Sequence, residues 1–159
     1  MTAPRRPGVG TPTHPARPGA TAPPVDALVG RAVELAFDSL NRIEREATRV
    51  ARWFRANARR EAHQGLTDLV NMTQSMASLA TAAASAIGID FDDFCATRGL
   101  PAESTTTALL NELLRHQQTD NTHALATVLE RRLAETLDVW RRVFVALAGG
   151  PTDPSGQAA

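Results

Sequence analysis

The residues best placed to do chemistry in this sequence are arginines that recur every three or four positions. They are Arg42, Arg45, Arg49, Arg52, Arg55, Arg59 and Arg60, and we call these seven residues the arginine face. Because side chains three and four positions apart share one side of a helix, most of them are expected to lie opposite the apolar Ile43, Val50 and Phe54. Guanidinium groups gathered in this way can bind nucleic acid, acidic lipid or an acidic protein surface.

Two other interpretations of the arginine face stay open. Within this stretch only Glu44 and Glu46 oppose it, and weak pairs with them would leave a plain solvated surface. Acidic residues from the second half of the chain can also cover it. The chain as a whole has 17 Arg, no Lys and 17 acidic residues, so its formal net charge is zero and it shows no global preference for anions. No DNA-binding motif accompanies the arginines.

Four residues with metal-binding side chains follow one another at helical spacing: Glu112, His116, Asp120 and His123. On one continuous helix the first three would share a face and suit zinc or iron. The polar run over 116–121 is expected to interrupt the helix, and the paired Glu-x-x-His motifs of a di-iron bundle are absent. We therefore predict no metal site here and interpret these residues as a polar helix end and turn.

Asp90, Asp92 and Asp93 lack the central glycine and final glutamate of a calcium loop, and helix capping accounts for them. Cys95 is the only cysteine, so an intrachain disulfide is excluded. Arg98, one helical turn away, is expected to lower the pKa of its thiol modestly, but we interpret Cys95 as a structural residue. No phosphate loop, nucleophile elbow or Ser-His-Asp arrangement is visible, so we predict a protein without cofactor, small-molecule substrate or enzymatic activity.

The first 24 residues hold seven of the ten prolines and no apolar period, which predicts a disordered arm. No apolar segment follows Arg5 and Arg6, so no export signal is readable. The longest apolar run, from Leu79 to Ile89, is too short to span a bilayer. These features predict a cytoplasmic protein.

Beyond the arm, apolar residues recur at helical steps, and 43% of the chain is hydrophobic with few aromatics. We predict an all-α, antiparallel bundle over 25–148 with about four main helices and one short helix, followed by a flexible tail over 149–159. The first predicted helix starts at 25 and can reach 63, where it either projects or breaks, with Gly65 as the obvious stop. The others cover 67–87, ending at Gly88; a short one within 90–99; one starting at Pro101; and one capped by Asn121 or Thr122. The last two should form a hairpin.

Two features of these helices bear on function. A first helix reaching residue 63 would be roughly 60 Å long, which is more than the rest of the bundle can cover. The small side chains of 77–86 would let a neighbouring helix approach closely, so this segment is expected to lie centrally in the bundle. Met72, Met76, Trp53 and Trp140 are interpreted as core residues or, alternatively, as a hydrophobic partner groove.

In general form the chain resembles small bacterial helical adaptors and export chaperones, which pair a helical hairpin with a long amphipathic helix. The long first helix, the apolar stripe that continues along it and the absence of a catalytic motif favour a non-enzymatic protein–protein interaction module. It would act through helix-on-helix contacts, and self-association along the first helix is one form of this. The alternative is binding of nucleic acid or another polyanion through the arginine face and the basic arm.

Overall fold

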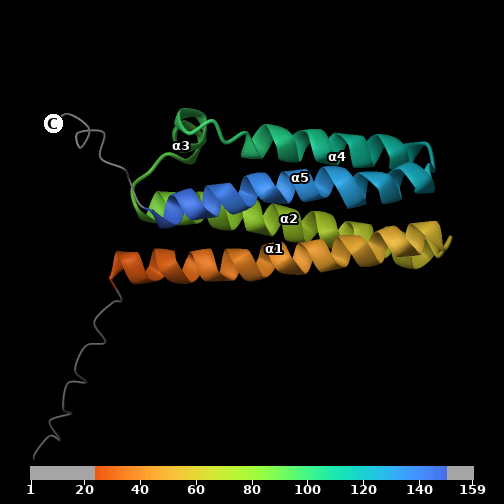
Figure 1. The fold of residues 1–159 in the computed structure, drawn as a ribbon, viewed down its shortest axis with the longest axis horizontal. Coiled ribbons are helices and arrows are strands. Elements are labelled where there is room, and N and C mark those ends of the chain that lie inside the picture. Colours follow the sequence, from red (N-terminus) through yellow and green to blue (C-terminus); the bar gives the residue numbers. More distant parts are fainter. Residues whose placement is uncertain (1–23, 150–159) are drawn as a thin grey trace, which may run out of the picture.

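The described part of the chain, residues 24–149 of a computed structural model, consists of helices joined by short turns (Figure 1). The helices are α1 (Val25–Arg55), α2 (Arg59–Ala86), α3 (Phe91–Thr97), α4 (Ala102–Gln118) and α5 (Thr122–Ala148). The predicted all-α bundle of four main helices and one short helix is confirmed. Residues 1–23 and 150–159, and with them nearly all of the predicted arm and tail, lie outside the described residues.

The four long helices run antiparallel to their neighbours in the order α2, α1, α5, α4. α1 packs along both α2 and α5, and α4 packs on the other side of α5. The short α3 lies at the end of the bundle where α2 finishes and α4 begins (Figure 1). α2 and α4 have no comparable packing against each other, so one long side of the bundle stays open; we call it the seam.

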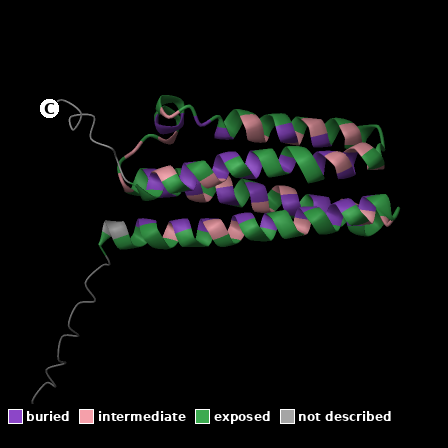
Figure 2. Cartoon of the chain, in the orientation of Figure 1, coloured by how far each residue is buried: buried purple, intermediate pink, exposed green. Residues whose placement is uncertain are grey.

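The core is mostly aliphatic, and buried residues alternate with exposed ones along each long helix (Figure 2). α1 contributes Leu40, Ile43 and Val50, all fully buried, at the three- and four-residue steps that the sequence shows. α5 contributes Trp140 and Phe144 along with a row of leucines and valines. Burying each such side chain stabilises the fold by about 1.5–3 kcal/mol, which outweighs the weak intrinsic helix preference of the valines.

The first helix does not reach residue 63, so of the two alternatives for it, projecting or breaking, the structure shows a break. Asn57 adopts a left-handed backbone with φ of 57° and ends α1 at Arg55. The amide of Ala58 donates to the carbonyl of Trp53, and that of Asn57 donates to Phe54, which is the hydrogen-bond pattern of a helix ending in a left-handed residue. Asparagine tolerates this conformation better than most residues, so the chain turns eight residues before the glycine that seemed the obvious stop.

With that turn in place, no helix projects from the bundle. α1, α2 and α5 contain 31, 28 and 27 residues, so α1 at about 46 Å is matched in length by both of its neighbours. Within the described ranges, no helix is both long enough and apolar enough to cross a membrane.

The remaining helix boundaries follow the sequence more closely. Gly88, with φ of 72°, lies just beyond the end of α2, and the Asp90 carboxylate accepts hydrogen bonds from two amides at the start of α3. Asn121 caps α5 by accepting from the amide of Ala124, and the packing of α4 against α5 confirms the predicted hairpin. Pro101 precedes α4 as its N-cap residue rather than occupying its first turn.

Gly65 lies inside α2, where it allows close contact with α1. A Cβ atom at this position would come 2.6 Å from Cγ2 of Val50 and 3.0 Å from the Trp53 ring. Val50 is fully buried and β-branched, so it cannot move aside without disturbing the core. Gly65 is therefore a packing residue at the α1–α2 contact.

We expect Gly65→Ala to destabilise the protein relative to Gly30→Ala, because only Gly30 has open space where the new methyl group would sit. Both changes gain up to about 1 kcal/mol of helix propensity, whereas overpacking at Gly65 costs about 1–3 kcal/mol. Urea unfolding of the two variants measures the difference. Equal stability would show that α1 and α2 are farther apart than described.

Candidate functional site

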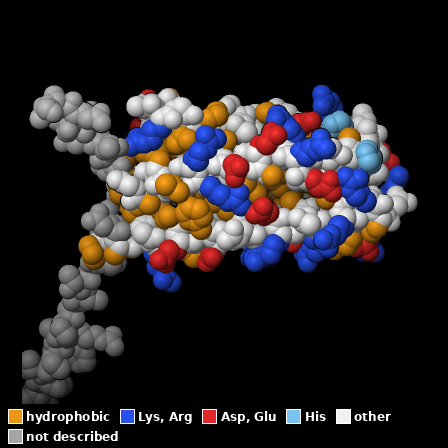
Figure 3. Space-filling model, in the orientation of Figure 1, with side chains coloured by type: hydrophobic (Ala, Val, Ile, Leu, Met, Phe, Trp, Pro, Cys, Tyr) orange, Lys and Arg blue, Asp and Glu red, His pale blue; other side chains and the backbone are white. Residues whose placement is uncertain are grey.

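The arginine face is divided between two helices. Arg42 to Arg55 lie on α1, whereas Arg59 and Arg60 begin α2 beyond the Asn57 turn. All seven side chains are exposed. Over α1 and α5, blue arginines alternate with red acidic side chains rather than forming a continuous positive surface (Figure 3).

Acidic residues of the second half of the chain pair with two of these arginines. Arg55 donates through Nε and Nη2 to the two carboxylate oxygens of Glu130 on α5, at 3.0 and 2.6 Å. Arg59 forms an ion pair with Asp120 in the α4–α5 turn. One of the open interpretations, coverage by distant acids, therefore applies to this end of the face.

The side chain of Arg49 contacts two residues of its own helix, Glu46 and Trp53. It donates to Glu46 at 2.6 Å, and its guanidinium lies 5.0 Å from the centre of the Trp53 ring. No ion pair is found within residues 24–149 for the other four members, which are Arg42, Arg45, Arg52 and Arg60.

The hydrogen bonds from Arg55 lower the pKa of Glu130 below its ordinary value of 4.5. A lowered folded-state pKa stabilises the fold above the unfolded-state pKa, and that contribution disappears as the pH falls through the folded value. We therefore expect the stability of Glu130→Gln to depend less on pH below about 4.5 than that of the wild type. Thermal unfolding between neutral and acidic pH tests this, with Glu34→Gln as the control, because Glu34 is exposed and forms no ion pair within residues 24–149. Parallel curves for all three proteins would exclude the pair as a contributor.

The four residues of the predicted hydrophobic groove do not meet in one place. Met76 and Trp140 are buried core residues, each 2% exposed. Met72 and Met76 border a shallow cavity between α1 and α2, together with Ser39 and Leu79. Trp53 packs against Gly65, and Trp140 lies at the floor of the seam.

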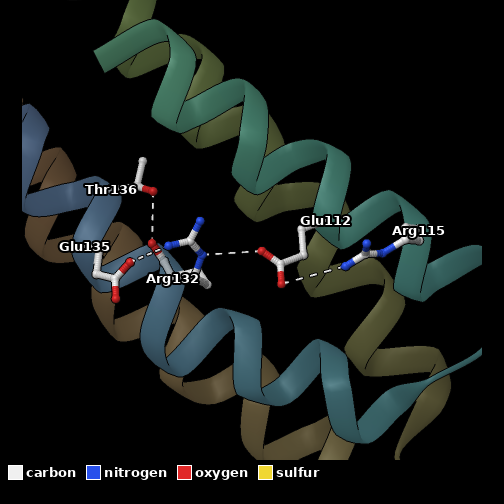
Figure 4. Close-up of polar contacts among 5 residues, drawn as sticks. All are labelled: Glu112, Arg115, Arg132, Glu135 and Thr136. Carbon is white, nitrogen blue, oxygen red and sulfur yellow. Dashed lines mark hydrogen bonds and ion pairs between the residues drawn. The ribbon is translucent and has the colours of Figure 1, made fainter. Parts of the chain in front are cut away.

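Two of the four residues considered as metal ligands, Glu112 and Asp120, take part in ion pairs. Glu112 on α4 contacts Arg132 on α5 at 3.4 Å and Arg115 at 4.0 Å, and Arg132 also contacts Glu135 (Figure 4). This network joins α4 to α5. Within the described ranges, no group of three or more His, Cys, Asp or Glu side chains is arranged to hold a metal ion.

Cys95 is buried in α3, and the expectation that Arg98 lowers its pKa is wrong. Burial raises the pKa of the thiol, and the nearby charge of Asp92 raises it further. The guanidinium of Arg98 lies 4.2 Å from the centre of the Phe94 ring. A buried thiol with a raised pKa is poorly suited to nucleophilic chemistry.

A cavity of about 720 Å³ forms the wide end of the seam. Its floor is Trp140, whose ring stacks on Phe91 with centroids 6.0 Å apart, and the indole Nε1 donates to Thr106 at 2.9 Å. Its lining comes from α2, α3, α4 and α5: Ala77, Ser78, Thr81, Ala82, Ser85, Phe91, Asp92, Glu103, Thr106, Thr107 and Trp140.

A second cavity of about 280 Å³ continues the seam toward the opposite end of the bundle. It lies between Leu66 and Val70 of α2 and Leu110, Leu113 and Leu114 of α4. Leu114 is 52% exposed, which is unusual for a large apolar side chain on a helix that otherwise buries its leucines. The seam is therefore apolar along much of its length.

The expectation that residues 77–86 lie at the centre of the bundle is wrong. Ala80 and Ala84 face the core, but Ser78, Thr81, Ala82 and Ser85 are exposed. The segment therefore lies at the edge of the opening rather than at the centre of the bundle. Small side chains do permit close approach, but no helix of the described chain occupies this side.

The seam carries no charge on α2. From Leu69 to Ile89 the sequence contains no acidic, arginine or histidine residue. Acidic residues occur only at the wide end, where Asp92 of α3 and Glu103 of α4 line the cavity. The sequence alone shows that this stretch is uncharged. It does not show that the stretch faces α4 across a gap, because the position of α4 depends on how the helices pack.

Comparisons with known proteins add no family to this description: no protein-family model matches the chain, and neither does any curated protein or solved structure.

Proposed function

We propose that this protein is a non-enzymatic interaction module that binds a helix of a partner protein in the seam between α2 and α4. The observation that carries this proposal is an uncovered apolar seam in a bundle whose other long sides are closed by packed helices. Exposed apolar grooves with polar edges are typical of sites that receive an amphipathic helix.

Three hydroxyl groups along the seam support this proposal. Ser78 donates to the carbonyl of Gln74 at 3.1 Å, Thr81 to Ala77 at 3.2 Å, and Thr106 to Ala102 at 2.7 Å. Each hydroxyl proton is therefore satisfied within its own helix. A partner helix can cover these residues without leaving a buried donor unpaired, which would otherwise cost about 1–3 kcal/mol for each group.

A second copy of the chain is one possible partner. Leu28 and Leu35 are 50% and 51% exposed and lie two turns apart on the same side of α1. Their position agrees with the idea of self-association along the first helix. Sedimentation equilibrium of the purified chain distinguishes this arrangement from a foreign partner.

We expect Ala82→Arg to abolish partner binding while leaving the fold intact, because Ala82 is exposed and lines the seam. Ala108→Arg is the matched control, since Ala108 is an exposed alanine within α4 that does not line the seam cavities. Both changes should alter stability by less than about 0.5 kcal/mol, as is usual at exposed positions.

The measurement is affinity capture from the source cells with full-length wild type and both variants, followed by mass spectrometry. Partners retained by the wild type and Ala108→Arg but lost with Ala82→Arg support the seam as the site. The same set of proteins with all three baits would exclude it.

The second candidate function is polyanion binding, favoured by the exposed arginines without an ion pair in the described part of the chain. Arg45 and Arg52 lie on α1, and Arg60 lies in the first turn of α2. The pairs of Arg55 and Arg59 with distant acids reduce the positive charge at the same end. This leaves a smaller cationic surface than the sequence alone suggests.

If polyanion binding occurs, replacing Arg45, Arg52 and Arg60 with Gln should weaken retention on DNA and RNA at low salt. Each lost phosphate contact should reduce the slope of log K against log salt by about 0.7–0.9. The control replaces three exposed arginines elsewhere: Arg31, Arg131 and Arg142. Equal losses in both triple variants would indicate only a general effect of net charge.

A further inference from the structure

We infer that the wide end of the seam binds the proline-arginine segment Pro4-Arg5-Arg6-Pro7 of the same chain. The inference does not rest on the proposed function, because it concerns an intramolecular contact that needs no foreign partner. It starts from the cavity of about 720 Å³ over Trp140 and Phe91, which no described segment fills.

The chemistry of the cavity suits a proline-rich basic segment. Two stacked aromatic rings border it, and Phe91 is only half-buried. Asp92 and Glu103, both exposed, supply carboxylates at its rim. Segments of the pattern Pro-x-x-Pro adopt an extended helix that docks on aromatic side chains, and arginines between or beside the prolines pair with nearby acids.

The sequence before α1 has that composition. Residues 1–23 contain Arg5, Arg6, Arg17 and His14 but no acidic residue. They also contain the Pro-x-x-Pro pattern three times, starting at Pro4, Pro12 and Pro15. The first of these holds two arginines, one for each carboxylate at the rim of the cavity.

The geometry of the fold makes the contact reachable. α1 begins at the same end of the bundle as α3 and the start of α4 (Figure 1). An extended polyproline helix advances about 3.1 Å per residue, so the 17 residues between Pro7 and Val25 span up to roughly 50 Å. Four packed helices are only about 20–25 Å across, so the segment can cross the end of the bundle.

The absence of lysine allows a direct test with the full-length chain. A purified chain of this sequence has its only primary amine at the amino terminus, so an amine-reactive nitroxide attaches a few residues from Arg5 and Arg6. In isotope-labelled protein we expect strong paramagnetic broadening of NMR signals from the cavity, centred on Ser78, Phe91 and Thr107. Broadening should decrease several-fold when salt is raised, because the contact is partly ionic.

The charge variants decide between this contact and a chance approach. Arg5→Gln/Arg6→Gln and Asp92→Asn/Glu103→Gln should each abolish the broadening. The matched control, Glu61→Gln/Asp68→Asn, removes two exposed acids from the far part of α2 and should leave it unchanged.

Two results would overturn the inference. The first is weak broadening spread over the whole surface, or broadening that the cavity variants do not alter. The second is broadening of similar strength when nitroxide-bearing chains without isotope are mixed with isotope-labelled chains without nitroxide, since that would place the contact between molecules. Neither result depends on the partner-capture experiment, so this inference and the proposed function can fail separately.

Discussion

The apolar surface of α5 is the constraint on which the rest of this structure depends. Leucines, valines, Trp140 and Phe144 are buried along nearly the whole helix, and they extend around more than one of its sides. α1 packs on one of these sides and α4 on another. Because α2 is held mainly by α1, it faces α4 without packing against it, and the seam results from this arrangement.

Ion pairs strengthen the sides that are already closed. Arg55–Glu130 and Arg141–Glu44 join α1 to α5, and Glu112–Arg132 joins α4 to α5. Exposed pairs of this kind contribute little energy individually, so they add only modestly to an arrangement that apolar packing sets. Within residues 24–149 no ion pair joins α2 to α4. Hence neither packing nor charge closes the seam.

Local chemistry explains what could be predicted from the sequence. The helical period of the apolar residues, the caps at Asp90 and Asn121 and the left-handed Gly88 depend on neighbouring residues, so the helices and the α4–α5 hairpin followed from them. The end of α1 was missed because an asparagine took the left-handed position that glycine usually occupies, while Gly65 served the contact with α1.

The candidate site was less predictable because it depends on tertiary placement. The arginine spacing was evident in the sequence, but the pairing of Arg55 with Glu130 joins residues 75 positions apart. Similarly, the small residues of 77–86 are compatible with a buried or an open helix face, and only the position of α4 decides between them. The seam could be found only once the helix order was known.

Solvent access along the open seam can be measured directly. A neutral, soluble gadolinium chelate added to the full-length protein at high salt, which keeps the proposed ionic contact of the arm weak, broadens NMR signals of solvent-exposed groups. We expect strong broadening of Ser78, Ala82 and Leu114, comparable with the exposed Ser104, and little effect on the buried Ala80 and Ala84. If Ser78, Ala82 and Leu114 were as protected as Ala80, α2 and α4 would be in contact in solution and the account would be wrong.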